Sequence, residues 1–296
     1  MIRQHTPETW NGAKLLGNYA PGSPEWHAER QNGVGGSEVG TILGLNQWES
    51  AYALWAKKLG KIDGEVKENW AIRFGKAFEE PILKLWMEDH PEWDVVTTGT
   101  YQDPKCPYRH ANPDAIAIHK ETGEEMIIEV KTARNTWDEV PKSYIAQVLH
   151  YMGVMGIKRG IIVAVAGMTW SETEVPYNQD WIAMQNESID RFWKCIETDS
   201  KPAWDGSEST YNAVRTQYAD IDGSECELGQ LGFQLVQAQI TSDKAYYELN
   251  LLKSQVLDMM GTAKWGVLTD NRRTRRIASR QMRAGKASLI VNKKEM

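Results

Sequence analysis

The stretch from Ala111 to Ala133 constrains the fold more than any other part of the sequence. It predicts two short strands, Asp114–His119 and Glu125–Lys131, joined by the turn residues Glu121-Thr122-Gly123. Both strands carry apolar residues on both faces, so both should be buried inside a sheet. A buried hairpin of this kind makes a central sheet the framework on which the rest of the chain packs.

Two carboxylates and a lysine are expected to meet on this hairpin. If the turn centres near Glu121 and Thr122, Asp114 lies opposite Glu129, with paired Cβ atoms about 4.5–5.5 Å apart. Strand periodicity places Lys131 on the same face as Glu129. Two carboxylates in a dry place repel each other unless a cation binds there. Hard oxygen ligands suit Mg²⁺ or Mn²⁺ rather than zinc.

The hairpin therefore contains a PD…ExK pattern, Pro113-Asp114 followed by Glu129-Val130-Lys131. The pattern resembles that of the restriction-endonuclease-like nuclease superfamily. Short matches of this kind are common, and a turn followed by a strand with a surface Glu and Lys accounts for the two dipeptides equally well. The other signals along the chain decide between these interpretations.

Charge is distributed unevenly along the 296 residues. The net charge is −6, which by itself argues mildly against a nucleic-acid-binding protein. Residues 271–296 contain nine Lys or Arg and one Glu, a local +8 that leaves −14 for the rest. An acidic body that binds metal, joined to a basic tail, is compatible with DNA. Three widely spaced cysteines predict reduced thiols without a zinc pattern, and no apolar run is long enough to span a membrane.

The order of the predicted elements indicates a mixed α/β fold, with a mixed central β-sheet flanked by helices. Residues 1–22 are expected to be an irregular arm. A kink or restart is expected at Pro81, and the core candidates in that helix are Trp70, Phe74, Phe78, Leu85 and Trp86. The expected helices are 23–30, 37–43, 50–59, 68–88, 141–155 and 180–198, and the expected strands besides the hairpin are 95–101, 161–166 and 169–175.

A glycine-rich turn, Gly33-Val34-Gly35-Gly36, lies between the first two helices and is flanked by Arg30 and Ser37. Ser37 is expected to cap the second helix. Backbone N–H groups at a helix start attract anions, so the turn is a candidate anion site. A plain turn between helices explains the same residues, and on this stretch alone that explanation is favoured.

The C-terminal part of the chain has a regularity of its own. Residues 228–260 show alternating three- and four-residue steps of apolar or small residues, interrupted by Ser242, which predict a long helix or helical hairpin. That seam could pack on the body or pair with another subunit. The basic piece that follows is partly strand-like. We therefore divide the chain into a nuclease domain, residues 1–220, and a C-terminal extension, residues 221–296.

Five ordered signals together resemble one family, the YqaJ-like viral recombinases, a group similar to the phage lambda exonuclease. The resemblance covers about residues 25–210 and implies a restriction-endonuclease-like core. The signals are Arg30 with Gly33 and Ser37-Glu38-Val39, then Gly75-Lys76-Ala77-Phe78-Glu79, Pro113-Asp114, Glu129-Val130-Lys131 and Tyr144-Ile145-Ala146-Gln147.

The resemblance implies roles for individual residues around a metal centre. Asp114 and Glu129 would bind metal together with the Val130 carbonyl. Glu79 would serve a second metal or its outer shell, and Lys131 would orient and activate the attacking water.

Further residues are implied to hold the substrate. Gln147 and Tyr144 would position the water or the scissile phosphate, and Arg30 and Ser37 would hold a 5′-terminal phosphate. The family's serine two residues before the Asp is Asn112 here, which leaves one phosphate contact open.

The expected function is a Mg²⁺-dependent 5′-to-3′ exonuclease on linear double-stranded DNA in phage-type recombination, with Mn²⁺ as a substitute metal. The alternatives are an endonuclease of the same fold or a non-catalytic DNA-binding or assembly module. The expected partners are double-stranded DNA ends and, from the resemblance, further copies in a trimeric ring and a single-strand annealing protein. No membrane is involved, and the expected location is the cytoplasm of a bacterial host.

Overall fold

The computed structural model describes residues 2–20, 22–64, 68–270 and 273–293. Parts of the predicted basic tail, residues 271–272 and 294–296, lie outside the described residues. The chain divides into two compact units, Met1–Asp220 and Ile221–Met296. None of the helices in the described part of the chain is long and apolar enough to cross a membrane.

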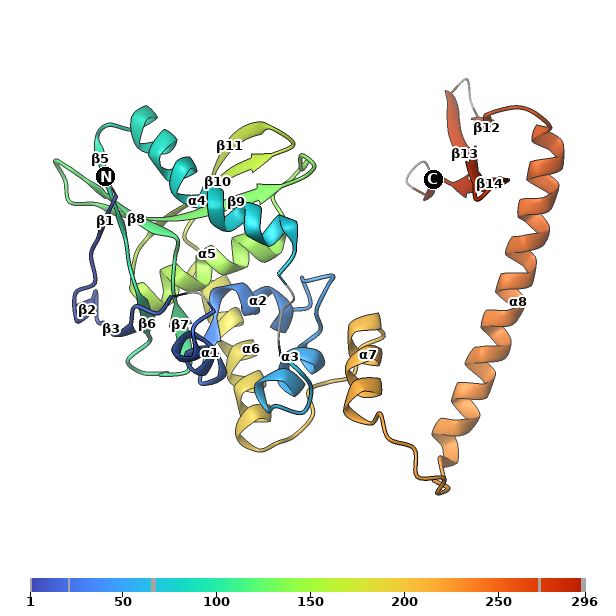
Figure 1. Ribbon diagram of the computed structural model, residues 1–296, viewed down its shortest axis with the longest axis horizontal. Helices are drawn as coiled ribbons and strands as arrows, with labels where there is room; N and C mark the ends of the chain where they lie inside the picture. The colour runs from blue at the N-terminus through green and yellow to red at the C-terminus, as the bar shows by residue number, and fades with distance from the viewer. Residues whose placement is uncertain (1, 21, 65–67, 271–272, 294–296) are drawn as a thin grey trace. The chain divides into compact units, whose positions relative to one another are not determined.

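The predicted hairpin lies inside a mixed sheet with the strand order β1-β5-β8-β9-β10-β11 (Figure 1). β8 and β9 pair antiparallel, β9 and β10 pair parallel, and β11 forms an antiparallel edge. The bounds are β1 Arg3–Gln4, β5 Trp93–Thr97, β8 Ala115–His119, β9 Glu125–Ala133, β10 Arg159–Ala166 and β11 Thr169–Glu174. This arrangement confirms the predicted hairpin, the buried strand after it and the mixed character of the sheet.

Alternate residues of a strand point to opposite sides of the sheet, and here both sides carry apolar residues. Helices therefore cover both faces of this sheet. Ile127 of β9 packs in a cluster with the buried side of α5 (Lys142–Met155). Ile128, the next residue, packs in a second cluster with Ile82, Leu83 and Trp86 of α4 (Trp70–Asp89). The predicted fold class, a mixed sheet flanked by helices, is therefore confirmed.

A third cluster joins α5 to the other helices of the N-terminal unit. Ala146 of α5 packs there with Tyr52 and Trp55, and with Ile189 and Phe192 from a later helix. The Ser23 and Ser50 hydroxyls cap two of these helices, α1 and α3. The bounds are α1 Pro24–Gln31, α2 Gly36–Ile42, α3 Ala51–Lys58, α6 Gln179–Glu197 and α7 Glu208–Gln217.

The prediction of an irregular arm at residues 1–22 is wrong. This segment contributes β1 to the central sheet, and two further strands to a second sheet of order β2-β3-β6-β7-β4. The predicted strand 95–101 is split between the two sheets, because β5 ends at Thr97 and the next strand begins at Thr100. The second sheet consists of β2 Thr9–Trp10, β3 Ala13–Gly17, β4 Val34–Gly35, β6 Thr100–Gln102 and β7 Arg109–Ala111.

Helix α4 differs from its prediction in two ways. It runs through Pro81 as one helix instead of restarting there. Trp70, Phe78 and Leu85 are exposed, whereas Trp86 is buried as predicted. The buried stripe is shorter than the apolar stripe of the sequence, because the buried residues Ile82, Leu83 and Trp86 all lie in the second half of the helix.

The C-terminal unit consists of one long helix followed by a small sheet. Helix α8, Gly229–Met260, is a single helix in which no residue is buried. Three antiparallel strands follow it, β12 Trp265–Asp270, β13 Arg273–Arg283 and β14 Lys286–Val291. The partly strand-like character predicted for this piece is confirmed.

Candidate functional site

The two carboxylates of the hairpin lie where the strand register predicts. Ala115 pairs with Ile128, so the next pair along the ladder is Asp114 and Glu129. The Val130 N–H donates a hydrogen bond of 2.7 Å to Asp114 Oδ2 and fixes that carboxylate directly before the start of β8.

Glu129 lies at the centre of the site, and only 2% of the residue is exposed. Its Oε1 accepts hydrogen bonds from Lys131 Nζ at 2.5 Å and from Gln147 Nε2 at 2.7 Å. Gln147 Nε2 also donates to the Tyr151 hydroxyl at 2.9 Å. Glu129 Oε2 is buried and has no hydrogen-bond partner among the described residues. A buried carboxylate oxygen without a partner is costly, so this atom is suited to bind something positive.

The Lys131 side chain lies between Glu129 and an aromatic ring. Its Nζ is 4.9 Å from the centroid of the Tyr144 ring, which itself contacts Trp137 edge-on at 5.6 Å between centroids. The structure therefore brings together Glu129, Lys131, Gln147 and Tyr144. Tyr144 contacts the cluster through its ring. The resemblance had instead implied that Tyr144 positions the water or the scissile phosphate.

Glu79 reaches this group from helix α4. Close approach of α4 to β9 depends on Gly75, where a Cβ atom would lie 3.3 Å from Thr132 Oγ1. Glu79 lies one turn further along the helix. Its carboxylate is partly buried, and burial together with repulsion from Asp114 raises its pKa to about 7.

The carboxylates of the site share an excess of negative charge. Burial, repulsion from Asp114 and, more weakly, repulsion from Glu79 raise the pKa of Glu129 to about 8, despite the attraction of Lys131. Burial also raises the pKa of Asp114. For Lys131, burial would lower the pKa, but Glu129 and Asp114 outweigh burial and raise it. Without metal, Lys131 is thus a cation rather than a proton acceptor.

These residues fit a divalent cation in part. Asp114, the unpartnered Glu129 Oε2 and the Val130 carbonyl are hard oxygen donors, and the excess of negative charge favours a cation. Within the described residues, however, no three His, Cys, Asp or Glu side chains form a group that could hold a metal ion. The site suits Mg²⁺ in that respect, because Mg²⁺ is usually held by one or two carboxylates together with waters and substrate phosphates.

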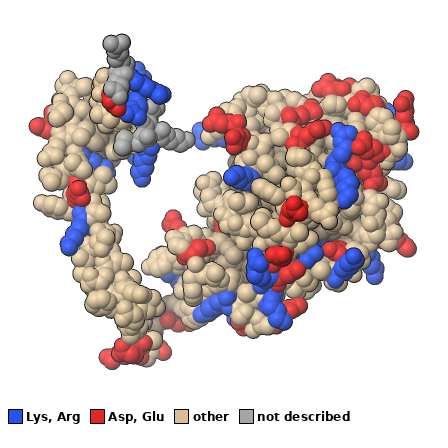
Figure 2. Space-filling view, turned by 180° about the vertical axis from the view of Figure 1, so that it is seen from behind, with Lys and Arg blue, Asp and Glu red and all other residues tan. Residues whose placement is uncertain are grey.

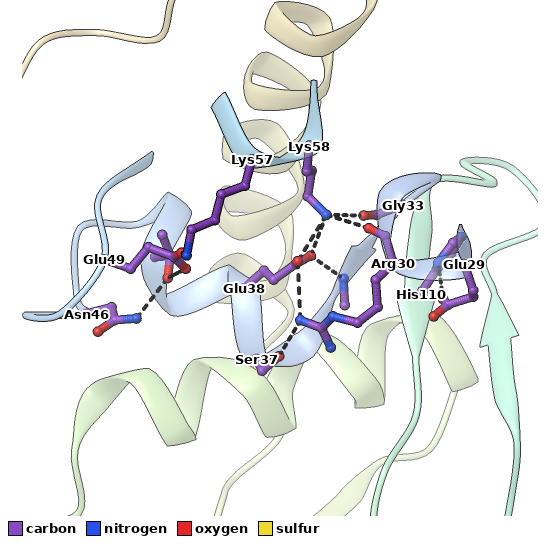
Figure 3. Close-up of polar contacts among 12 residues, drawn as sticks. Glu29, Arg30, Gly33, Ser37, Glu38, Asn46, Glu49, Lys57, Lys58 and His110 are labelled. Carbon is purple, nitrogen blue, oxygen red and sulfur yellow. Dashed lines mark hydrogen bonds and ion pairs between the residues drawn. The ribbon is translucent and has the colours of Figure 1, made fainter. Parts of the chain in front are cut away.

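A second polar cluster lies at the start of α2 (Figure 3). Arg30 Nη2 donates to Ser37 Oγ at 3.2 Å, so the two predicted phosphate contacts are neighbours. Arg30 also pairs with Glu38 Oε1 at 3.2 Å, and Glu38 Oε2 lies 2.9 Å from Lys58 Nζ. Burial would raise the pKa of Glu38, but Lys58 and Arg30 outweigh burial and lower it. Glu38 is therefore an anion held between two cations.

Two details of this cluster differ from expectation. Ser37 is not the cap of α2: the helix begins at Gly36, and the Glu38 carboxylate accepts the Gly35 N–H at 3.0 Å in its place. The glycines at 33 and 36 are explained by packing, because a Cβ atom there would collide with the rings of His110 and Tyr151 respectively. They do not by themselves indicate a phosphate.

Three residues have a different place in the site than the sequence predicted: Asn112 lies outside both clusters, whereas Glu38 and Lys58 belong to the second one. Asn112 is exposed and has no described polar contact with either cluster. In the sequence, Glu38 belonged to the Ser37-Glu38-Val39 signal but had no predicted role of its own, and Lys58 was not predicted to be a site residue. Lys58 lies in the last turn of α3, and the sequence contains no periodic signal that would connect it with Glu38.

A buried histidine beside the site predicts acid sensitivity. Burial lowers the pKa of His150 to about 4, and its Nδ1 has no partner among the described residues. The unfolded chain, with an ordinary histidine pKa near 6.5, binds more protons between those values, so stability falls as pH decreases from about 6.5 to 4. The expected contribution is about 3 kcal/mol. Urea unfolding of the unmutated protein and of His150→Gln, at pH 7 and at pH 4, measures this contribution. The difference in unfolding free energy between the two proteins should shrink from pH 7 to pH 4, and a constant difference would contradict the prediction.

Comparison with known proteins agrees with the fold and the motifs. Residues 25–158 match the family model described as the YqaJ-like viral recombinase domain. The chain is similar to the uncharacterized protein YqaJ of Bacillus subtilis (strain 168), with 27% identity over 266 residues that cover 82% of this chain and 80% of that protein.

Among solved structures, the chain resembles LHK-Exo in complex with dAMP, with a TM-score of 0.50 and 20% identity over 60% of this chain and 94% of that one. LHK-Exo is an alkaline exonuclease from Laribacter hongkongensis. At this level of identity, the likeness concerns the fold alone.

Proposed function

Residues 25–158 belong to the YqaJ-like viral recombinase family, and from this membership we propose that the chain is a nuclease that acts in DNA recombination. In its finer form, the proposal is a Mg²⁺-dependent exonuclease that degrades the 5′-ended strand of linear double-stranded DNA. The proposal includes Mn²⁺ as a substitute metal and action in the cytoplasm of a bacterial host. A ring of three copies and a single-strand annealing partner are further parts of it, and they rest on the resemblance alone.

One observation supports this function above the others. A buried carboxylate, Glu129, lies beside a cation and an amide, and one of its oxygens has no partner in the described part of the chain. A structural ion pair would use both oxygens, whereas a metal-binding carboxylate keeps one available. A non-catalytic module would not need to maintain such an arrangement at an energetic cost.

The residues have separate tasks in this proposal. Asp114, Glu129 and the Val130 carbonyl would hold Mg²⁺, and Glu79 would join them or bind an outer water. The bound metal would neutralise charge on the phosphate and favour a hydroxide nucleophile. Lys131 keeps its positive charge beside the attacking water, and Gln147 holds Glu129 in position through its amide.

The proposed reaction is tested with two DNA forms. Linear duplex and a supercoiled circle without ends are incubated with the protein, with Mg²⁺ and with chelator. We expect nucleotide release from linear duplex with Mg²⁺ and an intact circle. Cleavage of the circle would favour the endonuclease alternative, and no cleavage of either form would contradict a nuclease.

Recognition of the DNA end is expected to depend on Arg30. The guanidinium presents a planar set of donors that fits the additional oxygens of a terminal phosphate. Glu38 already neutralises part of this charge, and the buried Lys58 Nζ donates to the Arg30 and Gly33 carbonyls and to Glu38, so a terminal phosphate would bind to Arg30. Duplex with a 5′-phosphate should be digested faster than duplex with a 5′-hydroxyl, by roughly tenfold for about 1.4 kcal/mol.

The comparison is a time course on both substrates. Arg30→Ala should remove most of the preference while Mg²⁺ binding is unchanged, and Arg30→Lys should retain part of it. Equal rates on both ends for the unmutated protein would mean that Arg30 and Ser37 are structural.

A further inference from the structure

The end of the C-terminal sheet is a ribbon of two strands. β12 pairs with β13 no further than Trp265↔Ser279. Beyond that point, β13 pairs only with β14 among the described residues. This pairing continues as far as Arg283↔Lys286. Residues 281–286 are all exposed. The ribbon therefore extends from the sheet with no third strand and no helix of its own unit to cover it.

The turn at the tip of the ribbon has a defined geometry. Ala284 and Gly285 both have positive φ, 48° and 74°, as in the two-residue turn that matches the twist of a hairpin. The residues on either side of the turn, Arg283 and Lys286, are directly opposite each other. Like charges at paired positions destabilise a hairpin. A bound anion would remove this repulsion.

Positive charge dominates the whole sheet. Its three strands carry one acidic residue, Asp270, against six Lys or Arg, and Figure 2 shows such side chains gathered at the end of the C-terminal unit that holds this sheet. Among the described residues, Arg280, Arg283 and Lys286 form no ion pair with an acid. The six Lys or Arg of the three strands are Arg273, Arg275, Arg276, Arg280, Arg283 and Lys286. The surface therefore suits an extended polyanion.

The cations at the ribbon lie on both of its faces. Arg280 and Arg283 are three residues apart on β13, so they point to opposite sides, and Lys286 shares the side of Arg283. Four residue pairs, from Arg280↔Leu289 to Arg283↔Lys286, give a length of about 13 Å at 3.3 Å per residue. The major groove of DNA is about 12 Å wide and 8.5 Å deep and admits a two-stranded ribbon. Inside the groove, a ribbon has phosphates on both sides.

We propose that this ribbon, residues 280–289, enters the major groove of duplex DNA, with Arg280 on one side and Arg283 and Lys286 on the other contacting the backbones. Naming duplex DNA as the partner rests on the proposed function. Single-stranded DNA fits less well, because it is held by several aromatic rings. The three strands contain one such ring, Trp265, and Arg276 already lies 4.7 Å from its centroid.

The test is the salt dependence of DNA binding by the full-length protein. The DNA is a duplex closed at both ends by loops, so that recognition of a terminus contributes nothing, and chelator prevents cleavage. Each phosphate that the protein no longer neutralises makes the slope of log K against log salt concentration less steep by about 0.9. Arg280→Gln/Arg283→Gln/Lys286→Gln together should therefore reduce the slope by about 2.7.

A matched control removes the same charge from the N-terminal unit. Lys84, Arg191 and Lys194 are exposed and pair with acids on their own helices, so changing all three to Gln should leave the slope unchanged. Arg280→Lys/Arg283→Lys keeps the charge and should keep the slope, which separates loss of charge from loss of folding. Melting temperatures of all variants are measured alongside.

Three results would overturn the proposal. The first is an unchanged slope in the ribbon variant Arg280→Gln/Arg283→Gln/Lys286→Gln, and the second is an equal change of slope in the control variant. The third is a loss of binding that is confined to single-stranded DNA or to phosphatidylserine vesicles. The proposal and the nuclease assignment fail separately. Cleavage of linear duplex together with an unchanged slope would refute only the ribbon, and a reduced slope in a protein that cleaves nothing would refute only the nuclease.

Discussion

Lys131→Ala is expected to lower the rate of duplex cleavage by roughly 10²–10³-fold while the protein still folds and binds DNA. Lys131 Nζ lies 2.5 Å from Glu129 Oε1, and both carboxylates of the hairpin hold it in the charged form. It can therefore stabilise negative charge that develops at the phosphate without being a metal ligand. Removing it takes away that stabilisation, whereas the carboxylates remain.

The measurement compares single-turnover cleavage rates with duplex affinity in chelator. Lys142→Ala, an exposed lysine on the neighbouring helix α5, serves as the control and should retain the full rate. Lys131→Arg keeps the charge and should recover part of the activity. Cleavage at a near-normal rate by Lys131→Ala, with unchanged affinity, would remove Lys131 from the catalytic group.

Glu129→Gln and Asp114→Asn are expected to abolish Mg²⁺-dependent cleavage and the stabilisation of the protein by Mg²⁺. A ligand that binds only the folded state at a hundred times its Kd raises the unfolding free energy by about 2.7 kcal/mol. Each variant lacks one of the two hairpin carboxylates, so this increase should be lost.

The metal-free variants should show the opposite effect on stability. The pKa of Glu129 is raised to about 8, so its ionisation destabilises the metal-free protein as pH increases from about 4.5 to 8. In chelator at pH 8, Glu129→Gln should be more stable than the unmutated protein, and the gap should close near pH 5. Calorimetric unfolding with and without Mg²⁺ measures both effects. Equal stabilisation by Mg²⁺ in the variants would place the metal elsewhere.

The hairpin could be predicted in detail because its signals are local. Apolar residues on both faces of the strands, a short turn and a PD…ExK spacing fix the register of Asp114 against Glu129 without knowledge of any distant contact. In the predicted helix 141–155, Tyr144, Gln147 and Tyr151 recur at i, i+3 and i+7, which places them on one face. That Gln147 lies 2.7 Å from Glu129, however, depends on how α5 crosses the sheet, which periodicity does not specify.

The parts that could not be predicted depend on distant partners. The two-residue strands β1 and β4 are too short to show a period, and they exist because the distant strands β5 and β7 pair with them. Lys58 binds Glu38 across 20 residues of chain. The exposed Trp70 and Phe78 of α4 continue the apolar stripe of the sequence, although the buried residues of the helix all lie in its second half.

The buried hairpin carboxylates are proposed to form a metal-dependent nuclease centre, and the proposed catalytic roles of Glu79, Lys131 and Gln147 depend on that centre. Its most direct test is a Mg²⁺ titration of the metal-free protein on 5′-labelled linear duplex, followed as the initial rate of nucleotide release. We expect no release in chelator, a saturating rise with Mg²⁺ for the unmutated protein, and no rise for Glu129→Gln. Release at the same rate in chelator, or a normal Mg²⁺ response in Glu129→Gln, would contradict the claim.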